Sequence, residues 1–220
     1  MPDNTHHTAP LLQMRGISKA FPGVQALAGV DFRLFAGEVH ALMGQNGAGK
    51  STLIKVLTGV EAPDAGEIRL GEEPIAPASP LDAQQLGIST VYQEVNLCPN
   101  LSVAENIHIG RFPMRLGSID WRAANQAAEQ LLADLNIHLD VTLPLSLYPV
   151  AIQQMVAIAR ALSTEARILI LDEPTSSLDD EEVARLFAAI RTLKAKGMAV
   201  LFVTHFLDQT YAIADRITVL

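Results

Sequence analysis

Gly44-Gln45-Asn46-Gly47-Ala48-Gly49-Lys50-Ser51 is the stretch that decides the fold of this 220-residue chain. It fits the phosphate-binding loop pattern G-x-x-x-x-G-K-[ST] in full. An apolar run at 38–43 precedes it, and residues 52–57 follow with helical spacing. Strand, loop and helix are the context that this pattern needs, so the sequence predicts an α/β domain that binds nucleotide phosphates.

The chemistry of the loop follows from its residue types. Glycine has no Cβ, so the backbone can curl around a phosphate and direct N–H groups at it, and the start of the next helix adds positive potential. Lys50 would reach the β- and γ-phosphates, and the Ser51 hydroxyl would hold Mg²⁺. The candidate phosphate-binding residues are Gly44, Gln45, Asn46, Gly47, Ala48, Gly49, Lys50, Ser51 and Thr52.

A second motif lies at residues 167–173, where four consecutive apolar residues end in Asp172 and Glu173. An apolar run of this kind is typical of a strand buried on both faces. Unpaired carboxylates at its end are costly, so a cation is their natural partner. We expect Asp172 to lie on the Mg²⁺ side and Glu173 to deprotonate an attacking water. Acidic residues that simply begin a loop are the alternative.

Polar side chains also follow two other expected strands. Gln93 follows residues 88–92, and His205 follows residues 199–204. Ligands of open α/β sheets gather at the carboxyl ends of strands. Gln93 is therefore a candidate contact to Mg²⁺ or the attacking water, and His205 a candidate γ-phosphate sensor. A surface glutamine and an ordinary histidine are the alternatives.

The remaining sequence predicts a polar tail at 1–10 and one domain at 11–220. Strands are expected at 11–17, 30–35 and 67–70, a proline-rich loop at 72–80, and a mainly helical block at about 95–162. Within that block, Ser102 and Glu105 form a capping-box pattern, Asp120 can cap a helix over 121–135, and another helix is expected at 153–162. The acidic run 179–182 matches the dipole at the start of a further helix.

Composition excludes several classes of protein. The formal net charge is −8, which disfavours a nucleic-acid partner. A single cysteine, Cys98, excludes an internal disulfide framework. No apolar run approaches the ~20 residues needed to span a bilayer, and the polar N-terminus has no signal-peptide core.

Taken together, these motifs resemble the ATP-binding-cassette (ABC) ATPases. The motifs are the phosphate loop, Gln93, the run 171–175, the run 177–179 and Thr204-His205. Their order and spacing match. The resemblance implies a P-loop NTPase core with a mostly parallel sheet, an N-terminal antiparallel β subdomain and an inserted helical subdomain. It also implies ATP and Mg²⁺ as cofactors.

Residue roles follow from the resemblance. It makes Phe21 the aromatic that stacks on adenine, Gln93 the Q-loop residue, Asp172 the Mg²⁺ ligand and Glu173 the catalytic base. His205 becomes the switch histidine. The D-loop is Ser177, Leu178 and Asp179.

A narrower resemblance, to ATPases of bacterial monosaccharide importers of the ribose and galactose type, is carried by residues 21–24, 91–97 and 204–209. The likeness is nearest to the galactofuranose type. It implies a second cassette, membrane permease subunits and, indirectly, a periplasmic sugar-binding protein as partners. It also implies a peripheral location on the cytoplasmic face of the inner membrane. Because the sequence stops within an expected strand, we expect it to be truncated or the first of two cassettes.

One departure from the family pattern concerns its signature, L-S-G-G-Q, which contacts ATP held by the opposite cassette. The stretch in that place is Tyr148, Pro149, Val150, Ala151 and Ile152. Proline offers no N–H or hydroxyl, and valine places a Cβ where close backbone approach is needed. The expectation is an asymmetric pair of ATP sites, in which this chain lends a poor signature to its partner.

Two other classes share the phosphate loop. A non-transport cassette for DNA repair or translation is one, but the chain has neither a heptad tract nor a basic linker. A nucleotide-dependent kinase is the other. Glu173 beside Asp172, with His205 downstream, favours attack by water over transfer to a second substrate.

Overall fold

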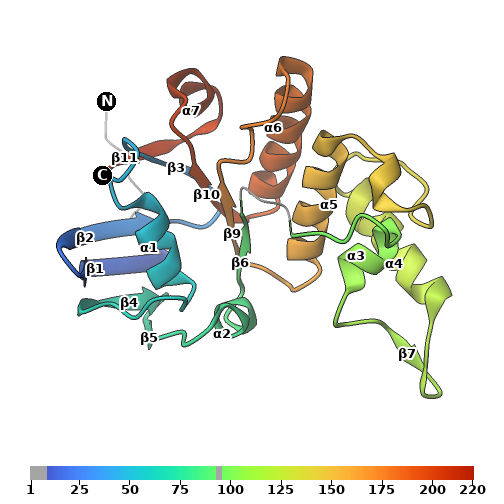
Figure 1. The fold of residues 1–220 in the computed structure, drawn as a ribbon, viewed down its shortest axis with the longest axis horizontal. Coiled ribbons are helices and arrows are strands. Elements are labelled where there is room, and N and C mark those ends of the chain that lie inside the picture. Colours follow the sequence, from blue (N-terminus) through green and yellow to red (C-terminus); the bar gives the residue numbers. More distant parts are fainter. Residues whose placement is uncertain (1–8, 93–95) are drawn as a thin grey trace.

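The computed structural model describes residues 9–92 and 96–220. Its two larger sheets meet around helix α1, and a group of helices with a small two-stranded sheet lies at one end (Figure 1). In the described part of the chain, no helix is both long and apolar enough to cross a membrane.

The central sheet is parallel and carries the strands after which the polar motifs follow. Its order is β11–β3–β10–β9–β6. The strands are β3 (Val39–Met43), β6 (Ile88–Val91), β9 (Ile168–Asp172), β10 (Ala199–Val203) and β11 (Arg216–Val219). All five residues of β3 and of β10 are buried. Such continuous burial is expected when both faces of a parallel sheet are covered, as the apolar sequences predicted.

The second sheet is antiparallel and has the order β2–β1–β4–β5. It contains β1 (Leu12–Phe21), β2 (Val24–Leu34), β4 (Ala65–Leu70) and β5 (Glu73–Ile75). Helix α1 (Lys50–Leu57) shares a buried apolar cluster with this sheet and with one face of the central sheet. The two sheets therefore form a single hydrophobic core around the helix that follows the phosphate loop.

The expectation of an unstructured loop at 72–80 was wrong in part. Residues 73–75 form β5, which pairs with β4 across the turn at Gly71 and Glu72. Gly71 has φ +62°, which glycine adopts without strain. Pro74 is tolerated because β5 is an edge strand. Helix α2 (Pro80–Gln85) follows, with Ser79 capping its first turn.

The helical end of the molecule contains α3 (Val103–His108), α4 (Trp121–Ala133) and α5 (Val150–Leu162), which pack on one another (Figure 1). A small hairpin of β7 (Met114–Arg115) and β8 (Ser118–Ile119) joins α3 to α4. Both predicted caps are present: Ser102 and Glu105 form the reciprocal capping box, and Asp120 accepts from the Ala123 N–H at 3.0 Å.

Helix α5 begins earlier than the sequence suggested. It starts at Val150 rather than Gln153, with Pro149 as the N-cap residue at φ −58°. Proline fixes φ near this value and lacks an N–H, so it is well suited to the position just before a helix. No side chain caps the helix. A hydrogen-bonded 3₁₀ turn over Leu145–Leu147 lies shortly before α5.

Helices α6 (Asp180–Ala195) and α7 (Leu207–Ile213) follow β9 and β10. The acidic run acts structurally at the start of α6. Asp179 accepts from the Glu182 N–H at 2.8 Å, and the Glu182 carboxylate accepts from the Asp179 N–H at 3.1 Å. The apolar side chains of α6 that face the core include Val183, Leu186, Phe187, Ile190 and Leu193.

Asn106 organises the loop that precedes α3. Its side chain is buried, and its Nδ2 donates to the carbonyls of Cys98 and Ser102, both at 2.9 Å. Its Oδ1 accepts from the Cys98 N–H at 2.7 Å. One buried amide therefore ties the backbone of the loop at 98–102 to the first turn of α3.

Replacing this amide tests the network. We expect Asn106→Leu to lower the free energy of unfolding by about 2–4 kcal/mol, because the four hydrogen bonds between this buried amide and the backbone of the loop are lost. Urea unfolding measures this change. The exposed Gln126→Leu on α4 is the control and should stay within about 0.5 kcal/mol of wild type. Equal effects of the two changes would contradict this role of Asn106.

Candidate functional site

The pairing of three strands brings the predicted motifs to one edge of the central sheet. Strand β10 lies between β3 and β9, with Val203 opposite Leu42 on one side and Asp172 on the other. All three strands run in parallel, so the phosphate loop, the paired acids and His205 each begin at the same edge. This arrangement is the one that the strand-end argument predicted.

The phosphate loop leaves β3 and ends at Gly49, the N-cap residue of α1, at φ +99°. A Cβ on Gly49 would lie 2.5 Å from the Ala26 carbonyl oxygen of β2, so only glycine fits there. The Lys50 side chain is buried and turns back over the loop. Its Nζ donates to the carbonyls of Gly44 at 2.7 Å and Gln45 at 3.1 Å. The ammonium group is therefore held within the curve of the loop.

Asp172 is the last residue of β9, and its carboxylate is partly buried. Burial raises its pKa above the ordinary value, the charge of Glu173 raises it further, and the nearby Lys50 ammonium opposes both effects. In the absence of a ligand, the ionised form of Asp172 is therefore destabilised by its surroundings. A positive ion near Asp172 would offset that cost.

Glu173 has an unusual backbone conformation for a residue with a side chain. Its φ is +47°, in the left-handed region. The Glu173 N–H donates to the Val203 carbonyl at 2.9 Å, which anchors the turn to β10. Strained residues of this kind are concentrated at functional sites. The turn directs the carboxylate toward His205, whose Nδ1 lies 3.3 Å from Glu173 Oε1.

The sequence interpretation missed a second link between the acidic loop and α7. Thr175 Oγ1 donates to Gln209 Oε1 at 2.6 Å, across 34 residues of sequence. Thr175 is buried, so the bond is shielded from water. It fixes the segment after Glu173 to the helix after His205. The pair lies in two of the quoted motifs, but no spacing rule joins them in the sequence.

The residues at this edge suit Mg²⁺ chemically. Ser51 is exposed on the first turn of α1, and Asp172 supplies a carboxylate. Within 9–92 and 96–220, no group of three His, Cys, Asp or Glu residues is placed to hold a metal ion. Few protein ligands are what Mg²⁺ requires, because it keeps waters and binds substrate phosphates. A hydroxyl and one carboxylate fit such a site.

The structure gives less information on two other predicted site residues, Phe21 and Gln93. Phe21 ends β1 and pairs with Val24, so it lies in the hairpin whose β2 strand contacts Gly49 through Ala26. The Lys19 ammonium lies 5.5 Å from its ring centroid. Gln93 lies outside the described residues, although β6 ends beside Leu171 of β9. The adenine and Q-loop roles stay predictions.

The D-loop and signature residues flank α5 and α6. Ser177 is exposed, Leu178 packs against the core, and Asp179 is the N-cap of α6. In the signature position, Tyr148 donates through its hydroxyl to the Asp140 carbonyl at 2.8 Å. Val150 is exposed at the first turn of α5, which leaves this end of the helix accessible.

Comparison with known families agrees with this geometry. The ABC transporter family matches residues 27–176. The chain belongs to this family. Among solved structures, MJ1267, an ATP-binding cassette of an ABC transporter in its ADP conformation, superposes with a TM-score of 0.87 at 27% identity. The alignment covers 97% of this chain and 88% of MJ1267. The fold is therefore that of a P-loop NTPase cassette, as predicted.

Curated relatives give a finer comparison. The galactofuranose transporter ATP-binding protein YtfR of Escherichia coli K12 is 55% identical over 210 residues. The ribose import ATP-binding protein RbsA 1 of Rubrobacter xylanophilus is 53% identical over 211 residues. Each alignment covers 96% of this chain but 42% of the relative. The chain therefore spans less than half the length of these relatives.

The charge balance at Asp172 leads to a stability prediction. Because its pKa is raised in the folded state, this group favours folding at low pH, and that contribution is lost as the pH rises through the raised pKa. We expect Asp172→Asn to raise the melting temperature of the nucleotide-free chain at pH 7 by about 2–4 °C, allowing for solvent screening. The difference should shrink as the pH is lowered from 8 toward 4.

Thermal unfolding across that pH range makes the measurement. Asp180→Asn is a matched control, since Asp180 is exposed at the start of α6 and favours the helix dipole. A melting temperature of Asp172→Asn at or below wild type at pH 7 would show that the carboxylate is not held at a cost.

Proposed function

We propose that this chain is an ATP-binding and ATP-hydrolysing cassette that powers a bacterial monosaccharide importer. The observation that carries the proposal is the alignment of β3, β10 and β9, which puts Lys50, Glu173 and His205 at one edge of the sheet. A lysine-bearing loop and an acid that can activate water are groups that hydrolysis of a γ-phosphate uses, and the family resemblance gives the hydrogen-bonded histidine the role of γ-phosphate sensor.

The described residues have separate roles in hydrolysis. The loop N–H groups and Lys50 hold the phosphates and neutralise their charge. Ser51 and Asp172 would hold Mg²⁺, which supplies electrostatic stabilisation of the phosphate oxygens when bound. Glu173 accepts the proton of a water that attacks the γ-phosphorus, and the bond to the β–γ bridging oxygen breaks. His205 holds the Glu173 carboxylate through the 3.3 Å contact, and its exposed ring is free to meet the γ-phosphate.

Two substitutions separate binding from chemistry. We expect Glu173→Gln to retain MgATP binding within a few-fold and to lower the single-turnover rate at least about 100-fold, because the proton acceptor is lost. Lys50→Met should weaken MgATP binding by about 10- to 100-fold, since a charged hydrogen-bond donor to the phosphates is removed. Calorimetry and quenched-flow assays measure these quantities. Normal turnover by Glu173→Gln would refute its role as base.

The altered signature extends the proposal to an asymmetric pair of ATP sites. Pro149 gives α5 no side-chain cap, and neither Pro149 nor Val150 offers a hydroxyl to a phosphate. The working site would combine the loops of this chain with a signature from a second cassette, in the same polypeptide or another.

This asymmetry predicts the behaviour of the isolated chain. It should bind MgATP with one site per chain yet hydrolyse it slowly and without cooperativity, because it cannot supply a competent signature to a second copy. Steady-state ATPase assays over a range of protein concentrations test this. Brisk hydrolysis that rises steeply with protein concentration would reject the asymmetry.

The transport role rests on the relatives, whose names assign them to galactofuranose and ribose import. We infer a monosaccharide as the cargo, with galactofuranose as the first sugar to test. The partners would be permease subunits and, through them, a periplasmic sugar-binding protein, with the cassette on the cytoplasmic face of the inner membrane. The formal net charge of −8 disfavours a nucleic-acid partner.

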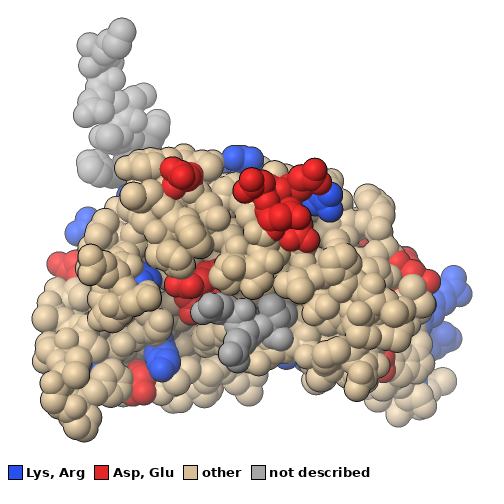
Figure 2. Space-filling model, turned by 45° about the horizontal axis from the view of Figure 1, so that its top comes forward, with Lys and Arg blue, Asp and Glu red and all other residues tan. Residues whose placement is uncertain are grey.

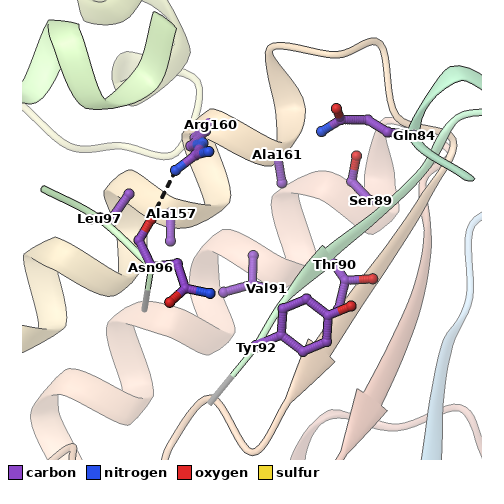
Figure 3. A pocket seen from close by; sticks show the side chains of 10 residues that line it. All are labelled: Gln84, Ser89, Thr90, Val91, Tyr92, Asn96, Leu97, Ala157, Arg160 and Ala161. Carbon is purple, nitrogen blue, oxygen red and sulfur yellow. Dashed lines mark hydrogen bonds between the residues drawn. The ribbon is translucent and has the colours of Figure 1, made fainter. Parts of the chain in front are cut away.

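A surface pocket of about 190 Å³ supports a permease contact close to the site (Figure 3). It lies between β6 and α5, and Tyr92, Asn96 and Arg160 are among its lining residues. Arg160 donates to the Asn96 carbonyl at 2.9 Å, which links α5 to the segment that follows the Q-loop position (Figure 3). A permease segment seated here would sense the end of β6. Reconstitution with the permease and sugar-dependent ATPase assays would test the pairing.

A further inference from the structure

The β7–β8 hairpin presents apolar and basic side chains together. It extends away from helices α3 and α4 at the end of the molecule opposite the antiparallel sheet (Figure 1). The hairpin is closed at its base, where the Asp120 N–H donates to the Pro113 carbonyl at 2.8 Å. It is thus an ordered projection of the chain.

The side chain at the tip is unusual for its position. Leu116 is 99% exposed and has φ +51°. In a tight hairpin turn, asparagine, aspartate or glycine adopts this conformation more readily than leucine, and the first two also interact well with water. A leucine here is unfavourable for both backbone and solvation in the chain alone. The solvation cost is removed when the side chain enters an apolar environment.

Neighbouring side chains enlarge the apolar surface. Met114 is 62% exposed, and Trp121, at the base of the hairpin, is 48% exposed. Phe112 packs edge-on against Trp121 with ring centroids 5.6 Å apart, which holds the indole in place. Tryptophan is the side chain most typical of the boundary between lipid and water.

The charges near the hairpin oppose those of the whole chain. Residues 109–122 contain three arginines and one acid, whereas the chain has a net charge of −8. The acid, Asp120, is occupied as the cap of α4. Within the described residues, Arg111, Arg115 and Arg122 form no ion pair. Basic side chains project at this end of the surface, with acidic ones beside them (Figure 2).

We propose that this hairpin patch, made of Arg111, Met114, Arg115, Leu116, Trp121 and Arg122, binds the anionic headgroup region of a membrane. The tip is convex, so Leu116 and Met114 can enter the soft interface without a preformed groove, and Trp121 lies at headgroup level. The arginines pair with lipid phosphates. The patch would give the cassette a lipid contact of its own, separate from the nucleotide site.

The acidic character of the rest of the chain does not prevent this contact. At physiological ionic strength charges are screened beyond about 8 Å, so a projecting hairpin experiences the membrane charge before the bulk of the protein does. Each basic residue near an anionic surface strengthens binding by about fivefold. Binding should therefore weaken when salt is raised.

The only tryptophan of the chain lies in the patch, which gives a direct test. The complete 220-residue chain is mixed with vesicles of phosphatidylcholine containing 30% phosphatidylglycerol, or with phosphatidylcholine alone. We expect a blue shift of Trp121 emission, protection from iodide quenching, and co-sedimentation with the anionic vesicles only. Absence of both shift and sedimentation at low salt would overturn the proposal.

Variants locate the contact. Arg115→Gln with Arg122→Gln should weaken vesicle binding about 25-fold, at about fivefold for each charge. Leu116→Asn, which suits the turn, should weaken it several-fold without destabilising the chain, and Leu116→Met should preserve it. Arg185→Gln with Arg191→Gln, both exposed on α6, is the charge-matched control and should leave binding within twofold. Equal losses in the control would mean that only overall charge matters, and would overturn the proposal.

Two further outcomes are informative. MgATP binding should be unchanged in all hairpin variants, so a failure of lipid binding is distinguishable from a failure of the nucleotide site. Vesicle binding that appears only when permease is reconstituted would show that the patch binds a protein, and would also overturn the proposal.

Discussion

The parallel pairing of β10 between β3 and β9 is the constraint on which the rest of the structure depends. Hydrogen bonds fix Val203 beside both Leu42 and Asp172, so the three strands end level with one another. Side chains far apart in sequence then meet without needing long loops. Two buried apolar clusters, one on each side of the sheet, supply the folding free energy that offsets the cost of placing charged groups at this edge.

Some residues of the site are fixed by hydrogen bonds, and others are in energetically unfavourable states. Lys50 is fixed by two loop carbonyls, and Thr175 is fixed to Gln209. Asp172 and Glu173 differ, because the first is a partly buried carboxylate with a raised pKa and the second has a left-handed backbone. Such groups are stabilised when a cation and a phosphate arrive. The energy of ligand binding is thereby coupled to the conformation of the acidic loop.

Much of this arrangement was predictable from sequence because its signals are local. The phosphate loop, the apolar run before Asp172, the capping box at Ser102 and the acidic start of α6 each lie within a few residues, and each was located correctly. The starts of β5 and α5 were not, since an edge strand with Pro74 and a helix that begins directly after Pro149 both look like loop. Tertiary pairing decides such segments. The Thr175–Gln209 bond and the positive φ of Glu173 likewise depend on chain parts that meet only after folding.

Gly49 is required for two separate reasons, the curvature of the phosphate loop and the packing of the two sheets. Its missing Cβ gives the loop its curvature, yet the atom that excludes a side chain is the Ala26 carbonyl oxygen, which belongs to the neighbouring antiparallel sheet. A glycine that is normally explained by ligand binding is therefore also required by the packing between the two sheets. A redesigned scaffold with this architecture would have to keep that glycine even after every nucleotide contact had been erased.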